Sequence, residues 1–302
     1  MPNWSQVLDE LRDEEAKRAN SEKSTLDIVR RRHLKALSDY SNRNVIAYYS
    51  GWLSKPYSFG MEIQDEDRNA FMMAVHQLDR TKGLDLVLHT PGGDIAAAES
   101  LVHYLRQMFG NDIRAIVPQI AMSAGTMIAC SCKSIVMAKH SNLGPIDPQV
   151  AGIPAAAVKE EFEEAIRQIN QDQSRLAGWQ FILNKYTPTY LAKCENAVKW
   201  SKEFVERELL ANMLQGQENA SEIASKIVER LTDFTGNKSH SRHIHFDECQ
   251  EIGLTVEYLE NDTDLQDLVL TVHHCFMHSL ANAPVIKIVE NQKGIAFIKS
   301  AA

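Results

Sequence analysis

Two stretches of this chain, about thirty residues apart, each run from a short apolar segment into a tight turn of small residues. Residues 84–94 read LDLVLHTPGGD, and residues 113–126 read IRAIVPQIAMSAGT. A short apolar run of this kind is typical of a buried strand, and each turn is followed by a sequence that favours a helix. The pattern predicts an α/β fold with βαβ units and a mainly parallel sheet.

The same alternation extends along the chain on both sides of these stretches. We expect strands at 45–49, 84–88, 113–117 and 134–138, with helices at 66–81, 95–109 and 123–132. After Pro154 the sequence favours helices at 155–173, 188–214, 220–232, 247–252 and 263–281, and a hairpin at 285–299. Because no proline- or glycine-rich linker interrupts the chain, we expect one domain with appended segments. These are an N-terminal helical arm (1–43), a catalytic core (44–260), and a C-terminal helix with a β-hairpin (261–302).

Composition and charge exclude several classes of protein. The chain has 302 residues, with 44% hydrophobic and 24% charged residues, which is ordinary for a globular protein. Its formal net charge of -8 argues against nucleic acid as the main partner, since such proteins present basic surfaces. There is no apolar run long enough for a transmembrane helix, and residues 1–5 lack the start of a secretory signal. We therefore expect a cytoplasmic protein without an integral membrane segment.

The cysteines agree with a reducing compartment. There are five, an odd number without the spacing of a disulfide framework, so we expect free thiols. Cys130 and Cys132 could begin a metal site, but no second pair accompanies them. Their apolar neighbours favour helix packing instead.

The two turns contain residues suited to acyl-transfer chemistry. Gly92 and Gly93 lack Cβ atoms and can expose backbone N–H groups to a developing oxyanion. Ser123 stands at the predicted start of a helix, where a nucleophile would gain from the free N–H groups and partial positive charge. Taken separately, the first turn could be a tight connection without a ligand. Ser123 could equally be a simple helix N-cap.

Taken together, the two turns resemble the Clp-protease/crotonase superfamily. The resemblance covers roughly residues 44–260 and is strongest over 84–149, through Thr90-Pro91-Gly92-Gly93, Met122-Ser123-Ala124-Gly125-Thr126 and Asn142-Leu143-Gly144-Pro145-Ile146-Asp147-Pro148-Gln149. The combination looks most like the serine-dehydrogenase-proteinase family, relatives of signal peptide peptidase A. The resemblance implies a Clp-protease/crotonase-like fold, with Ser123 as nucleophile and the N–H groups of Gly93 and Ala124 as the oxyanion hole.

The general base is less clearly marked. The histidine of a Clp-type Ser-His-Asp triad would fall near residues 144–147, where none occurs, and the nearest is His140. Signal-peptide-peptidase relatives use a Ser-Lys dyad instead, and the matching place points to Lys159, 36 positions after Ser123 (159 − 123). A lysine acts as a base only when burial or nearby positive charge lowers its pKa. Lys159 is our candidate base, against the alternative of a surface lysine on an amphipathic helix.

A histidine-rich stretch provides further candidates. Residues 240–245 read HSRHIH, so His240 or His243 could reach the active site as an alternative base. The spacing could also support a metal site, but no cluster of thiols or carboxylates accompanies it. We therefore predict no metal and no cofactor.

These observations predict a serine peptidase that cleaves proteins or peptides through an acyl-enzyme. By the resemblance we expect a homo-oligomer, with helices in 155–214 making the contacts between subunits. Two alternatives remain open. A crotonase-like acyl-CoA enzyme would share the oxyanion hole, and a non-catalytic oligomeric scaffold would need none of this chemistry.

Overall fold

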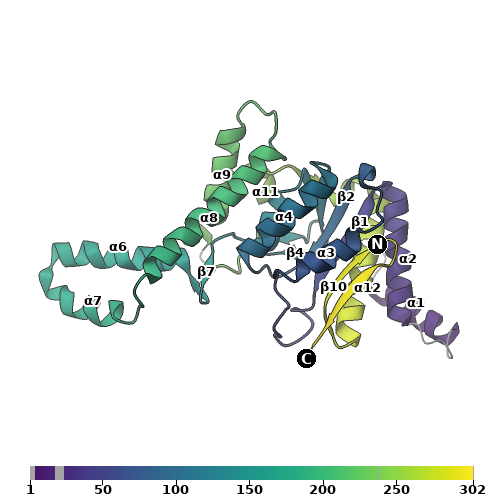
Figure 1. The fold of residues 1–302 in the computed structure, drawn as a ribbon, viewed down its shortest axis with the longest axis horizontal. Coiled ribbons are helices and arrows are strands. Elements are labelled where there is room, and N and C mark those ends of the chain that lie inside the picture. The colour runs from purple at the N-terminus through teal and green to yellow at the C-terminus, as the bar shows by residue number, and fades with distance from the viewer. Residues whose placement is uncertain (1–3, 18–23, 238, 302) are drawn as a thin grey trace.

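A seven-stranded sheet forms the centre of the protein in the computed structural model, which describes residues 4–17, 24–237 and 239–301 (Figure 1). The strand order is β11-β10-β1-β2-β3-β5-β9, and the five strands from β1 to β9 in this order run parallel. Strand β10 pairs antiparallel with β1, and β11 with β10. The predicted α/β fold with a mainly parallel sheet is confirmed. The strands are β1 (Asn44–Ser50), β2 (Leu84–His89), β3 (Ile113–Val117), β5 (Ser134–Met137), β9 (Val256–Tyr258), β10 (Val285–Asn291) and β11 (Ala296–Ser300).

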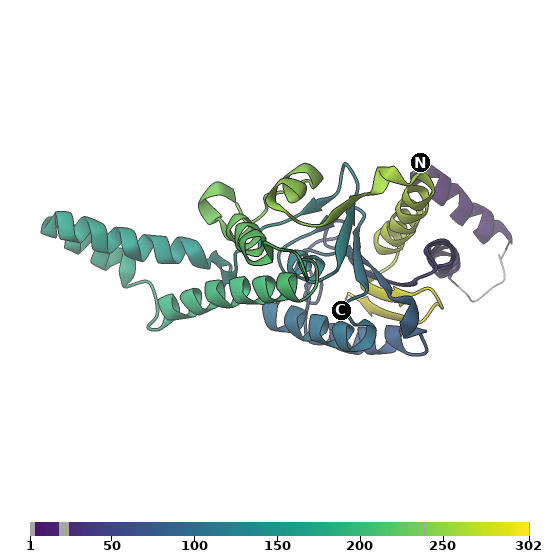
Figure 2. The ribbon, with the colours of Figure 1, turned by 90° about the horizontal axis from the view of Figure 1, so that it is seen from above.

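Helices cover both faces of the sheet, as the view from above shows (Figure 2). Every residue of β1 and β2 is therefore buried, which explains why these strands lack a polar alternation. Successive side chains enter different cores: Tyr48 packs in the larger core and Tyr49 in the smaller. The larger core includes α3 (Asp67–Val75), α4 (Ile95–Phe109), α5 (Ala124–Cys130), α8 (Tyr190–Ala211), α9 (Ala220–Thr232) and α11 (Phe246–Ile252), whereas the smaller includes α2 (Thr25–Ser41) and α12 (Thr263–Asn282).

Local sequence signals set the limits of the helices. Asp94 caps α4, because its carboxylate accepts a hydrogen bond from the Ala97 N–H at 2.9 Å, and α4 ends before Gly110 at φ 61°. The helix predicted over 66–81 is shorter than expected. It ends at Val75, because Gln77 has φ 63°, and a 3-10 turn η1 (Arg80–Lys82) follows.

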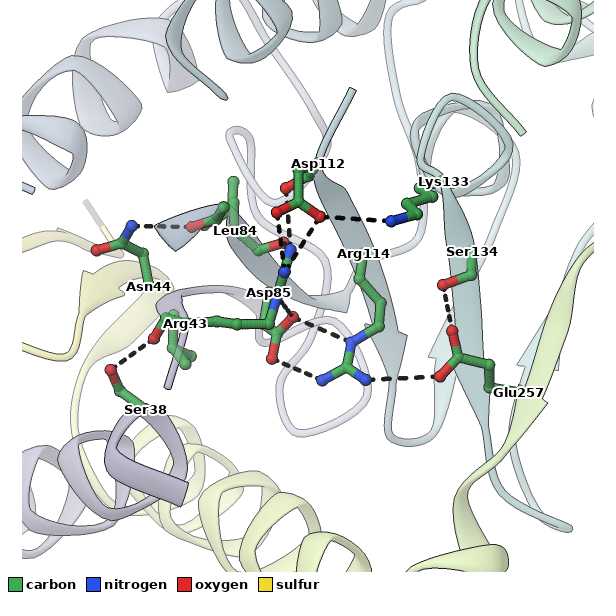
Figure 3. A network of polar contacts seen from close by, with 12 residues as sticks. Ser38, Arg43, Asn44, Leu84, Asp85, Asp112, Arg114, Lys133, Ser134 and Glu257 are labelled. Carbon is green, nitrogen blue, oxygen red and sulfur yellow. Dashed lines mark hydrogen bonds and ion pairs between the residues drawn. The ribbon is translucent and has the colours of Figure 1, made fainter. Parts of the chain in front are cut away.

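A buried charge network ties the strands together at their amino ends (Figure 3). Asp85 on β2 is fully buried and accepts from Arg43 Nε at 2.7 Å and from Arg114 Nη2 at 2.8 Å. Arg114 on β3 also approaches Glu257 on β9, whose carboxylate accepts a hydrogen bond from Ser134 on β5. These contacts fix neighbouring strands at the edge of the sheet opposite to the turns that follow β2 and β3.

A helical arm extends from one end of the sheet. Figures 1 and 2 show α6 (Ala155–Gln171) and α7 (Leu176–Leu183) lying beside each other and away from the body. The 3-10 turn η2 (Gln173–Arg175) joins them, and α8 leads back to the core. A small hairpin of β7 (Gln149–Val150) and β8 (Ile153–Pro154) forms the base of the arm.

The terminal segments pack on the same body. Helix α1 (Trp4–Lys17) contacts α2 and α12, while β10 and β11 are part of the central sheet. The division at 43/44 and 260/261 stays a prediction, and residues 1–3 and 18–23 of the predicted arm lie outside the described residues. In the part of the chain that is described, no helix is long and apolar enough to span a bilayer. The remaining short elements are β4 (Ile120–Ala121), β6 (Asn142–Leu143), α10 (Phe234–Asn237) and η3 (Leu259–Asn261).

Candidate active site

The two turns singled out in the sequence lie against each other at the carboxyl ends of β2 and β3. Thr90 and Ala121 form a parallel bridge, in which the Thr90 N–H donates to Ile120 O and the Met122 N–H donates to Thr90 O at 3.0 Å. A Cβ atom on Gly125 would lie 2.5 Å from the Thr90 side chain. These backbone hydrogen bonds hold the two turns against each other, at the edge of the sheet where α/β proteins bind ligands.

Ser123 has a strained backbone conformation. Its φ of 50° and ψ of -117° lie in a region that residues with a side chain seldom adopt. It is the N-cap residue of α5, and the turn is closed by the Gly125 N–H, which donates to Met122 O at 2.7 Å. A sharp turn of this type between strand and helix presents the hydroxyl of a serine to solvent. The partial exposure of Ser123 agrees with such a presentation.

The glycine turn is pinned beside this serine. A Cβ atom on Gly92, which has φ 95°, would lie 2.7 Å from the Ser123 Cβ, so glycine is required for the close approach. The Ile63 N–H donates to Gly92 O at 2.8 Å, and the Asp94 N–H donates to Ile63 O at 3.0 Å. Within the described residues, the N–H groups of Gly93 and Ala124 have no protein acceptor. Gly93 also lines the cavity over the two turns, whereas Ala124 is fully buried and is not among its lining residues.

A cavity of about 490 Å³ lies over the two turns. It joins residues from six regions of the chain: the segment before α3, the glycine turn, the serine turn with α5, residues 148–149, α8 and the loop after α10. The lining residues are Glu62, Pro91, Gly92, Gly93, Asp94, Ile95, Ser123, Met127, Pro148, Gln149, Ala197, Trp200 and His240.

His240 in this cavity is held by a buried carboxylate. Its Nδ1 lies 2.8 Å from Oδ1 of Asp147, whose side chain is 2% exposed, and Oδ2 of Asp147 accepts from Gln149 Nε2 at 3.3 Å. An imidazole that donates through Nδ1–H to a carboxylate keeps Nε2 as its proton acceptor. His240 is 28% exposed and thus accessible from the cavity. The pair has the chemistry of an oriented general base.

Long-range pairing brings these two residues together. Leu143 and Ile244 exchange backbone hydrogen bonds of 3.0 and 2.9 Å, so the segment before Asp147 runs beside the segment after His240. The Ile146 N–H donates to Leu231 O, and the Ser201 hydroxyl donates to Ile146 O at 2.7 Å. The backbone that carries Asp147 is thereby fixed from two sides.

The other base candidates lie elsewhere. Lys159 is on α6, with a half-exposed side chain 3.7 Å from Glu163, and it is not among the described residues that line the cavity. His140 and His243 are exposed and do not line it either. Ser123, Gly93 and His240 are brought together, whereas Lys159, predicted as the partner of Ser123, is not. No group of three or more metal-ligating side chains occurs among the described residues.

Sequence reasoning missed one member of the site. Asp147 belongs to the segment 142–149 that carries the family resemblance, but nothing in its local sequence assigns it a partner. The burial of Asp147, which the sequence does not reveal, is what requires a partner such as His240.

Comparison with known proteins identifies the family of the chain. Residues 18–292 match the model of the ClpP-like SDH-type serine proteinases. An uncharacterized protein of Methanocaldococcus jannaschii is 29% identical over 256 residues, which is 82% of this chain and 78% of that protein. A second uncharacterized protein of the same organism is 28% identical over 191 residues, which is 63% of this chain and 58% of that protein. Since the family model spans nearly the whole chain, the protein belongs to the ClpP-like SDH-type serine proteinase family.

Proposed function

We propose that the protein is a serine peptidase in which Ser123, His240 and Asp147 form the catalytic triad. One juxtaposition supports this proposal above all: Ser123 and a histidine bound to a buried carboxylate line the same cavity. His240 takes the place that the sequence suggested for Lys159. A Ser-Lys dyad would need a lysine with a lowered pKa, and Lys159 is half exposed beside a carboxylate.

The reaction follows from the roles of these groups. Nε2 of His240 accepts the proton of the Ser123 hydroxyl as its oxygen attacks the carbonyl carbon of the substrate. The N–H groups of Gly93 and Ala124 donate hydrogen bonds to the oxyanion that forms. His240 then gives its proton to the leaving amine, and water hydrolyses the acyl-enzyme by the same steps. Asp147 keeps the imidazole in the required orientation and stabilises its positive charge.

The proposal is tested by degradation of an unfolded protein, such as casein, from pH 6 to 10. We expect the wild type to cleave casein, and the variant Ser123→Ala to lose cleavage. Ser221→Ala is a matched control, because Ser221 is exposed on α9, away from the cavity. Equal cleavage by wild type and Ser123→Ala, or none by the wild type, would refute a peptidase centred on Ser123.

We also propose that a second copy of the chain covers the arm. Helix α7 has the sequence LAGWQFIL and no buried side chain, with Phe181 73% exposed. An apolar helix of this kind is rarely left in water. Phe181→Asp should shift the mass seen by light scattering toward the 34.0 kDa of one chain. Gln180→Asp is the control on the same helix, and a wild type of 34.0 kDa would contradict the proposal.

The compartment is a further proposal. All five cysteines are buried free thiols, as predicted, which agrees with a reducing compartment such as the cytoplasm.

A further inference from the structure

We propose that the cavity beside Ser123 selects substrates with a positively charged side chain next to the cleaved bond, through the carboxylates of Glu62 and Asp94. This inference rests on the proposed peptidase function and concerns the choice of substrate at the same site. Glu62 and Asp94 both line the cavity, and the described lining residues include no lysine or arginine.

Neither carboxylate is neutralised by another side chain. The Glu62 carboxylate raises the pKa of the nearby Tyr57 hydroxyl, and a neutral phenol adds no positive charge to this carboxylate. Asp94 accepts the Ala97 N–H through Oδ1, and this cap likewise adds no cation. Among the described residues, no lysine, arginine or histidine forms an ion pair with either group. The cavity is therefore lined by two carboxylates that form no ion pair with a cationic side chain in the described structure.

The backbone places both acidic residues next to Gly93, one of the two predicted oxyanion donors. Glu62 immediately precedes Ile63, which pairs with Gly93 in a parallel bridge, and Asp94 immediately follows Gly93. Hydrogen bonds of 2.8 and 3.0 Å hold this pairing on either side of Gly93. A substrate whose carbonyl oxygen binds the Gly93 N–H would thus have its neighbouring side chain close to the two carboxylates.

The opposite wall suits the stem of a long cationic side chain. Ala197 and Trp200 of α8 line the cavity, and the Trp200 side chain is held by its indole N–H, which donates to Glu99 Oε2 at 2.9 Å. Trp200 is 41% exposed, so part of its ring is accessible. An aromatic face attracts a cation and packs well against methylene groups. Lysine and arginine carry both features, whereas an acidic side chain would be repelled.

The test uses fluorogenic peptides that differ only in the residue before the leaving group, which is lysine, norleucine or glutamate. Norleucine has a similar apolar stem without the charge. We expect the wild type to cleave the lysine peptide with a kcat/KM about tenfold above that of the norleucine peptide, and the glutamate peptide most slowly. Glu62→Lys should abolish the preference for lysine, and Asp94→Asn should reduce it. Asp65→Asn removes one negative charge from an exposed residue outside the cavity and should leave the ratio unchanged.

Binding separates this inference from the proposed function. Fluorescein-labelled forms of the three peptides are titrated into Ser123→Ala, which cannot turn them over, and into Ser123→Ala combined with Glu62→Lys. Tighter binding of the lysine peptide to Ser123→Ala, lost in the double variant, would support charge selection. If the wild type nevertheless cleaved none of the peptides, only the peptidase proposal would be refuted. Equal binding of all three peptides, or a preference that Glu62→Lys does not alter, would overturn the inference.

Discussion

The Nδ1 atom of His240 lies 2.8 Å from Oδ1 of Asp147, although 93 positions separate the two residues in the chain. The carboxylate is almost completely buried, while the imidazole reaches the cavity that also contains Ser123. A buried carboxylate without a partner is costly, so the bond stabilises the fold as well as orienting the ring. The same contact thus supports both the packing of the loop after α10 and the proposed chemistry.

Asp147→Asn should lower kcat for casein or a peptide ester by about 10²–10⁴-fold, because the amide no longer holds His240 as a proton acceptor toward Ser123. Steady-state kinetics should show the loss in kcat, with KM changed little. Because the two residues act as a unit, the double variant Asp147→Asn with His240→Ala should be no slower than His240→Ala alone. A double variant slower by the product of both single effects would show that the residues act independently.

Gly92→Ala should abolish most activity, by about 10²-fold or more, because the new Cβ would lie 2.6 Å from Met122 O and 2.7 Å from the Ser123 Cβ. Gly110→Ala is the matched control. Gly110 also has a positive φ, of 61°, but a Cβ there would meet nothing within 4 Å. That control should lose about 1 kcal/mol of unfolding free energy and keep its activity. Full activity in Gly92→Ala would contradict this prediction, because it would show that Ser123 can move away from the new Cβ without loss of activity.

The free energy of unfolding should fall as the pH drops below about 6.5, partly through His89. This residue is fully buried among Tyr49, Trp52 and His273, both its ring nitrogens lack a partner in the described structure, and burial lowers its pKa to about 3. A pKa that is lower in the folded state means that the unfolded chain binds the proton first, so stability is complete above pH 6.5 and is lost progressively toward pH 3. At pH 5 the loss from His89 amounts to roughly 2 kcal/mol.

Urea unfolding at pH 7.5 and pH 5 measures this loss. His89→Phe should reduce the difference between the two pH values by about 2 kcal/mol, whereas His76→Gln, at an exposed position, should leave it as in the wild type. If His89→Phe lost as much stability on acidification as the wild type, His89 would not contribute to the pH dependence.

Asp85→Ala should destabilise the protein by roughly 3 kcal/mol or more, because it leaves Arg43 and Arg114 facing each other without a counter-ion. Asp112→Ala removes a carboxylate that also pairs with Arg43 but is 47% exposed, and this should cost about 1 kcal/mol at most. Denaturant titrations of both variants provide the comparison. Equal losses would mean that burial of Asp85 adds nothing to the strength of the network.

The sequence was sufficient for much of the fold, because local signals decide most of its elements. Asp94 and Gly110 mark the two ends of α4. The largely apolar run at 84–88 marks a strand that is covered on both faces. The early end of α3 was missed because it depends on the backbone of Gln77, at φ 63°, and glutamine does not signal such a turn. Helix α7 was also missed, since an apolar helix without a core to pack on leaves no amphipathic pattern.

The candidate site was predictable only in part, for a similar reason. Ser123 and Gly93 belong to turns whose residue types reveal their geometry. The proposed partner of Ser123 is not set by local sequence, because His240 lies at the cavity through the pairing of Leu143 with Ile244, about 100 residues apart. Lys159 had a suitable spacing in the chain, but its side chain is half exposed and it is not among the described residues that line the cavity.

We propose that His240, and not Lys159, activates Ser123. The most direct measurement is the rate at which a fluorophosphonate probe modifies Ser123, followed by intact mass and peptide mapping, in the wild type, His240→Gln and Lys159→Gln. We expect Lys159→Gln to react at the rate of the wild type, and His240→Gln to react at least about 10²-fold more slowly, since the general base is lost. Rapid modification of His240→Gln, or loss of reaction in Lys159→Gln, would contradict the assignment.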